Sequence, residues 1–109
     1  MPKFLHVYAQ PGFHEEAYLV GNREALAALR DAIDRALHNE RAALGAFTTD
    51  GEGYTVIVIA DSGDAIKIGL MSVPYTNDYA KEGRDRPVWP QDLLKPDERL
   101  ALEKEAWNR

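Results

Sequence analysis

Residues 22–39 read NREALAALRDAIDRALHN and carry the most regular secondary-structure pattern in the chain. Asn22 is a residue type that caps helix N-termini, and Glu24 lies where the helix dipole favours a negative charge. Apolar residues then recur three or four positions apart, at Leu26, Leu29, Ile33, Ala36 and Leu37. The pattern predicts an amphipathic helix whose apolar stripe faces the core.

The opposite side of this helix carries charges at helical spacing. Asp31 and Arg35 are four residues apart, as are Arg30 and Asp34, and each pair is expected to contribute a few tenths of a kcal/mol. Burying one large apolar side chain contributes about 1.5 to 3 kcal/mol, so packing outweighs these surface pairs. The helix therefore needs a partner, and we expect it to be a sheet.

Two regions with strand patterns flank the helix. Residues 3–10 alternate between an apolar face (Leu5, Val7, Ala9) and a wetter one (Phe4, His6, Tyr8, Gln10), and an extended run at 17–20 follows the Pro11-Gly12 turn. After the helix, turns at 50–53 and 61–64 separate extended runs at 46–49, 54–60 and 65–73, which predicts a three-stranded meander. Four consecutive apolar residues at 56–59 place the middle run at the centre of the sheet.

The predicted fold class is α+β, with elements in the order β-β-α-β-β-β. We expect one mostly antiparallel sheet of about five strands, with the amphipathic helix packed on one face. A chain of 109 residues fits one domain, here a core at 1–74, an irregular arm at 75–95 and a C-terminal helix at 96–107 that begins at Pro96.

The composition narrows the classes of function. The chain has no cysteine, which excludes disulfides, thiolate metal sites and cysteine nucleophiles. No apolar run approaches the roughly 18 to 20 residues that span a bilayer, and the N-terminus has no signal-peptide pattern, so we expect a cytoplasmic protein. A net charge of −5 without a basic stripe argues against nucleic acid and favours a basic protein partner.

Motifs for catalysis and cofactor binding are missing from the sequence. The histidines are not at metal-ligand spacing, and Asp50-Gly51-Glu52-Gly53 is better explained as a hairpin turn than as a calcium loop. Neither a nucleophile elbow nor a glycine-rich phosphate loop occurs. We therefore expect no metal and no cofactor, and we favour a non-enzymatic role.

Two groups of residues are candidate sites. Aromatic and arginine residues, the types that dominate interface hot spots, interleave in the arm at Tyr75, Tyr79, Arg84, Arg86 and Trp89. The alternative is that these aromatic residues only cover one side of the sheet. A second candidate is a pocket with proton-transfer groups, formed by His6, Tyr8, His14, Glu15 and Glu16.

The sequence favours a small acidic protein-binding module: an inhibitor, an immunity-type protein or a regulatory or accessory protein, as found in bacteria and phages. The first alternative is a small enzyme or ligand-binding domain that uses the His/Tyr/carboxylate pocket. The second is a homo-oligomeric structural or assembly protein that pairs through a free sheet edge.

Overall fold

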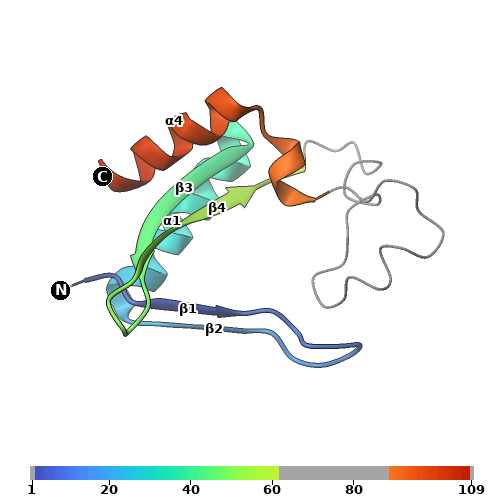
Figure 1. The fold of residues 1–109 in the computed structure, drawn as a ribbon, viewed down its shortest axis with the longest axis vertical. Coiled ribbons are helices and arrows are strands. Elements are labelled where there is room, and N and C mark those ends of the chain that lie inside the picture. The colour runs from blue at the N-terminus through green and yellow to red at the C-terminus, as the bar shows by residue number, and fades with distance from the viewer. Residues whose placement is uncertain (1, 62–88, 109) are drawn as a thin grey trace.

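The computed structural model describes residues 2–61 and 89–108, which form an α+β fold (Figure 1). A first hairpin, β1 (Leu5–Tyr8) and β2 (Tyr18–Gly21), leads into helix α1 (Arg23–Asn39). A second hairpin follows, β3 (Arg41–Phe47) and β4 (Gly53–Ile59). A 3-10 helix, η1 (Pro90–Leu93), then precedes helix α4 (Pro96–Trp107), so the C-terminal helix predicted at 96–107 is confirmed.

The core has three layers, with the β3–β4 hairpin between α1 and α4 (Figure 1). Alternate residues of β3 point to opposite faces, as strand geometry requires. Ala42, Leu44 and Ala46 are buried against α1, whereas Ala43 is buried in a smaller cluster with Leu102 and Ala106 of α4. The helix α1 therefore covers only one of the two faces of this hairpin.

Helix α1 begins and ends as predicted but presents a different face to the core. The Asn22 side chain accepts a hydrogen bond from the Ala25 N–H (3.0 Å), which confirms the predicted cap. The buried positions are alanines, namely Ala25, Ala32 and Ala36, with Ala28 and Leu29 partly buried beside them. The predicted stripe is wrong for its largest members, since Leu26 and Ile33 are more than 40% exposed and Leu37 is 69% exposed.

Close packing between small side chains explains this rotation. The alanines of α1 share one buried cluster with Ala42 and Ala46 of β3, so a leucine or isoleucine in their place would overpack this cluster. Arg35 also turns inward: its Nη2 donates to the Ala43 carbonyl oxygen (3.0 Å). The predicted pairing of Asp31 with Arg35 is replaced by an Arg30–Asp31 contact of 3.5 Å.

The prediction of a single sheet of about five strands is wrong. The structure has two separate antiparallel sheets of two strands each, β1–β2 and β3–β4, within the described residues. They meet at a parallel bridge between Phe4 and Phe47, where the Phe47 N–H donates to the Lys3 carbonyl oxygen (2.8 Å). Strand β3 ends at Phe47 and the chain turns, so within residues 2–61 and 89–108 the contact between the two sheets stops at this bridge. The strand predicted at 65–73 lies outside the described residues.

The turn predicted at 50–53 connects β3 and β4. The Gly51 N–H donates to the Thr48 carbonyl oxygen (3.0 Å), and Gly51 has a φ of 93°, a left-handed conformation that favours glycine. The Asp50 carboxylate accepts hydrogen bonds from the Thr48 hydroxyl and from the Glu52 N–H. The Thr48 hydrogen bond is the main cause that lowers the pKa of Asp50 below its usual 3.8.

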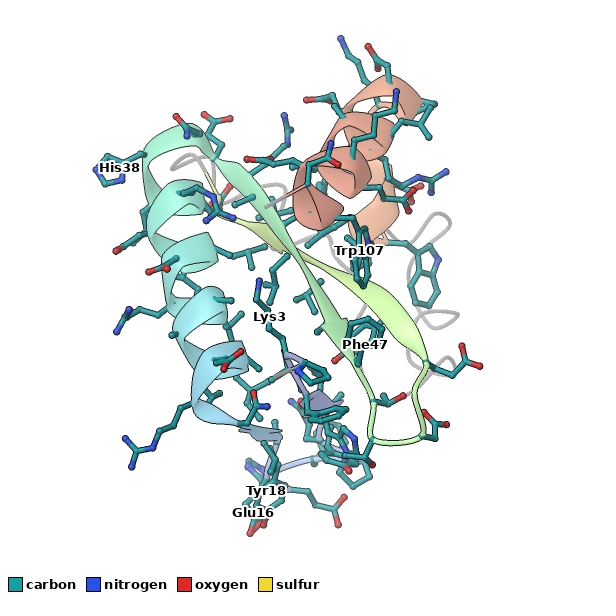
Figure 2. The ribbon with its side chains drawn as sticks, turned by 90° about the vertical axis from the view of Figure 1, so that its left-hand side faces the viewer. Lys3, Glu16, Tyr18, His38, Phe47 and Trp107 are labelled. Atoms are coloured by element: carbon teal, nitrogen blue, oxygen red, sulfur yellow. The ribbon has the colours of Figure 1, made fainter. Side chains whose placement is uncertain are left out.

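Helix α4 is attached to the second hairpin at both ends. Near its start, Arg41 of β3 forms an ion pair with Glu98 and donates to the Leu93 carbonyl oxygen (3.1 Å). At its end, the Trp107 indole N–H donates to the Thr55 hydroxyl (3.0 Å), and its ring meets Phe47 edge-on at 5.5 Å between centroids (Figure 2). These contacts hold a helix whose buried apolar residues, Leu102 and Ala106, are few.

Glycine in the middle of β3 makes room for this indole. A Cβ at Gly45 would lie 2.8 Å from three atoms of the Trp107 ring, and Cβ atoms essentially never lie that close to a neighbouring atom in proteins. Gly45 pairs with Thr55 across the hairpin, so the ring crosses both strands at this position.

Neither α1 nor α4 is long and apolar enough to cross a bilayer, and the same holds for the remainder of the described chain.

Candidate functional site

The β1–β2 hairpin projects away from the helices (Figure 1). Among the residues that the structure describes, it carries the largest group of exposed apolar side chains. Its base is fixed in the core by Leu5, which is fully buried and whose carbonyl oxygen accepts a hydrogen bond from the Tyr54 hydroxyl. Burial raises the pKa of this tyrosine above its usual 10.0. Beyond Leu5, the exposed apolar residues are between 51% and 58% exposed: Val7, Tyr8, Phe13, Tyr18, Leu19 and Val20.

His6 connects the hairpin to the β3–β4 turn through both ring nitrogens. Its Nε2 accepts a hydrogen bond from the Thr49 N–H (3.1 Å), which can only donate. In the neutral ring the proton therefore belongs on Nδ1, which lies 2.8 Å from the Tyr8 hydroxyl oxygen and donates to it. Both nitrogens are occupied by these contacts, which leaves neither free to accept a proton from a substrate.

An open groove of about 450 Å³ lies at the outer end of the hairpin. Tyr8 and Tyr18 line it, and they are direct cross-strand partners. Glu15 and Glu16 line it from the connecting loop, and Figure 2 shows Glu16 and Tyr18 together at this end of the molecule. The groove thus combines two aromatic rings with two carboxylates.

The charged residues of the hairpin itself have one sign. Between Phe4 and Asn22 the chain has no lysine or arginine, and its acidic residues there are Glu15 and Glu16. The turn that contacts His6 contributes two more carboxylates, Asp50 and Glu52. The hairpin is therefore an apolar surface with acidic groups along its side and end.

The structure brings together some of the predicted site residues. Tyr8, Glu15 and Glu16 share the groove, and His6 reaches it through its hydrogen bond to Tyr8. His14 does not line the groove; it is an exposed loop residue with a φ of 58°, next to the Phe13 ring (6.3 Å between centroids).

Of the predicted arm residues, the structure describes Trp89. Its backbone N–H donates to the Asp92 carboxylate (3.0 Å), which fixes the start of η1, and its side chain is 37% exposed. Tyr75, Tyr79, Arg84 and Arg86 lie outside the described residues, so their role as a partner-binding surface stays a prediction.

Tyr18 is the aromatic groove residue that sequence reasoning missed, beside the smaller lining residues Ala9 and Pro11. The alternation of residues 3–10 placed His6 and Tyr8 on one face, but the register between the two strands, which brings Tyr18 opposite Tyr8, comes from the folded hairpin. Among residues 2–61 and 89–108, no three histidine or carboxylate side chains gather in a way that could hold a metal ion.

No protein-family model, curated protein or solved structure matches the chain. Any functional assignment therefore rests on the geometry and chemistry of the surfaces described above.

Proposed function

We propose that this protein is a protein-binding module, acting as an inhibitor or as an immunity-type, regulatory or accessory protein, and that its hairpin binds a basic partner. The observation that carries the proposal is the groove in which Tyr8 and Tyr18 face the same space as Glu15 and Glu16. A lysine or arginine side chain of the partner would meet aromatic rings and carboxylates at once.

The groove chemistry suits an arginine or lysine side chain. A cation over a tyrosine ring contributes about 0.5 to 1 kcal/mol at an exposed site, and a charge-assisted hydrogen bond to a carboxylate contributes about 1.5 to 3 kcal/mol. Exposed aliphatic residues of the hairpin, such as Val7 and Leu19, supply apolar area around the charged contact. Apolar contacts around a central polar anchor are typical of interface hot spots.

The net charge supports a basic partner over a second copy of this chain. Two hairpins brought together would place four groove glutamates near one another, and nearby like charges cost free energy. The chain as a whole also has a net charge of −5, which slows approach of a second copy and accelerates approach of a basic protein.

Site-specific photo-cross-linking in the native host tests the proposal. A photoreactive residue replaces Leu19 on the hairpin in one variant and Leu100, which is equally exposed on α4, in a matched control. We expect one basic protein to cross-link from position 19 and not from position 100. Cross-links from position 19 only to a second copy of this chain, or equal yields from both positions, would overturn the proposal.

The purified pair then tests the role of the groove. We expect the double variant Glu15→Gln, Glu16→Gln to weaken binding about tenfold, with a smaller salt dependence. The charge-matched control Asp97→Asn, Glu103→Gln removes two carboxylates from α4 and leaves the groove intact. Equal loss of affinity in both double variants would show that only net charge matters and would contradict the groove assignment.

A further inference from the structure

A second cavity, of about 160 Å³ and separate from the hairpin groove, lies between α1 and β3. Its apolar lining includes Ala28 of α1 and Leu44 of β3, and Ala106 of α4 closes one side. Its size is close to that of a cavity of about 150 Å³ that binds benzene in another protein. The space thus suits a molecule of roughly six to ten non-hydrogen atoms.

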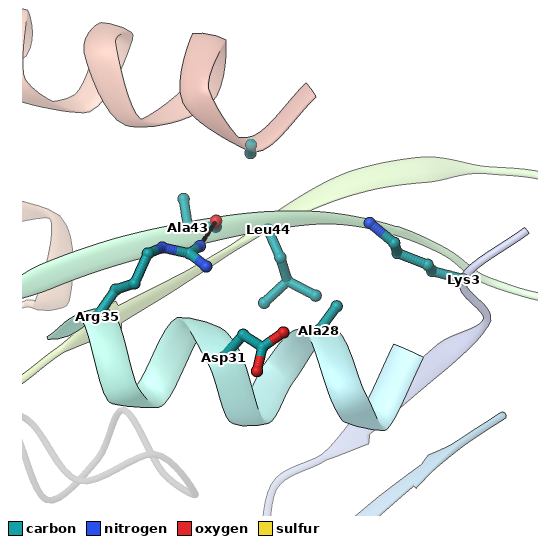
Figure 3. Close-up of a pocket in the computed structure, with 7 residues that line it drawn as sticks. Lys3, Ala28, Asp31, Arg35, Ala43 and Leu44 are labelled. Carbon is teal, nitrogen blue, oxygen red and sulfur yellow. Dashed lines mark hydrogen bonds between the residues drawn. The ribbon is translucent and has the colours of Figure 1, made fainter. Parts of the chain in front are cut away.

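Two cationic side chains enter this cavity from opposite ends. Figure 3 shows Lys3 and Arg35 pointing toward each other across it, with Leu44 between them. The backbone of Lys3 is held in place because its carbonyl oxygen accepts the Phe47 N–H (2.8 Å). Arg35 is fixed by its Nη2 contact to the Ala43 carbonyl oxygen (3.0 Å).

The Arg35 guanidinium also lies beside a carboxylate of α4. Its Nε is buried and has no hydrogen-bond partner, although Glu105 Oε1 lies 4.0 Å away. Asp31 is the acidic lining residue, so the lining has a net charge of +1 in a chain of net charge −5.

We propose that this cavity binds a small organic monocarboxylate. The carboxylate would lie between the Lys3 ammonium and the Arg35 guanidinium, and the apolar part would pack on Ala28, Leu44 and Ala106. A neutral molecule would not compensate the net charge of +1 that the lining carries. A dianion such as phosphate would be repelled by Asp31 and by Glu105 beside Arg35.

An NMR titration of the full chain with benzoate tests this site. We expect saturable shifts of the backbone amide signals of Lys3, Ala28 and Ala106, with a dissociation constant on the order of 1 mM. Benzamide, which has nearly the same shape and no charge, should bind at least about tenfold more weakly. Equal shifts with both probes, or no saturable shift with benzoate, would overturn the proposal.

Matched lysine variants connect the signal to the cavity. Lys3→Gln should weaken benzoate binding about tenfold, because it removes one of the two cations. Lys104→Gln removes an exposed lysine of α4 outside the cavity and should leave binding unchanged. Thermal unfolding of both variants checks that they remain folded, and an equal effect of the two substitutions on benzoate binding would contradict the assignment.

Discussion

Replacing Gly45 by alanine should destabilise the protein through the Trp107 indole. The added Cβ would lie 2.8 Å from ring atoms Cδ2, Cε2 and Cε3, so the indole has to move away from the strand. These atoms belong to the rigid centre of the ring rather than to the end of a flexible chain. The movement therefore changes every contact that the indole makes with the hairpin.

Two of these contacts set the magnitude. The indole N–H would lose its 3.0 Å hydrogen bond to the Thr55 hydroxyl, at about 1 kcal/mol, and its edge-on contact with Phe47 contributes about another 1 kcal/mol. Alanine gains about 0.5 to 1 kcal/mol over glycine in a strand because the unfolded chain has less freedom to lose. The net destabilisation is then about 1 to 1.5 kcal/mol, which lowers the Tm by roughly 4 to 6 °C.

A double-mutant cycle measured by urea unfolding separates the clash from the backbone effect. In a Trp107→Ala background the ring is gone, so Gly45→Ala should stabilise the protein by about 0.5 to 1 kcal/mol. The coupling between the two sites is therefore expected to be about 2 kcal/mol. The reasoning is refuted if Gly45→Ala is equally destabilising without the indole, or if it stabilises the unmodified protein.

Three further results are expected. Tyr54→Phe should cost about 0.5 to 1.5 kcal/mol at neutral pH because the hydroxyl donates to the Leu5 carbonyl. The folded-state pKa of Tyr54 is raised above 10.0, so the stability that its hydroxyl contributes is present below pH 10 and lost as the pH rises further. Urea unfolding above pH 10 should therefore show a smaller difference in stability between the unmodified protein and Tyr54→Phe. Glu98→Gln should cost about 1 kcal/mol by breaking the ion pair with Arg41, and a cost unaffected by added salt would contradict this explanation. Ala32→Leu should destabilise by about 1 to 3 kcal/mol in thermal unfolding, and a smaller loss would show that the helix can move away from the sheet at little cost.

Local sequence signals predicted the helices and the first hairpin well. The cap at Asn22 and the proline at position 96 are short-range features, and both mark a helix start in the structure. The buried face of α1 was not predictable in the same way, because a hydrophobic pattern gives most weight to large residues. The interface between α1 and β3 is instead formed mainly by alanines, and this depends on how the helix packs on the strand.

Long-range pairing explains the remaining differences. Asp50 and Gly51 could be assigned to a turn from the sequence, because a turn depends on neighbouring residues. The contact between the two sheets at Phe4 and Phe47 could not, because it depends on how strands distant in the sequence meet. The groove shows the same difference between local and long-range signals. Alternation placed His6 and Tyr8 on one face, but only the hairpin register shows that Tyr18 joins them.

The alanine contact between α1 and β3 also limits which substitutions the sequence can accept during evolution. Positions 25, 32, 36, 42 and 46 are limited by an upper bound on side-chain volume, so glycine or serine should be accepted there more readily than valine or leucine. Leu26, Ile33 and Leu37 experience no such bound and are free to become polar as far as core packing is concerned. Distant relatives should therefore be recognised by a recurring pattern of small residues rather than by shared leucines.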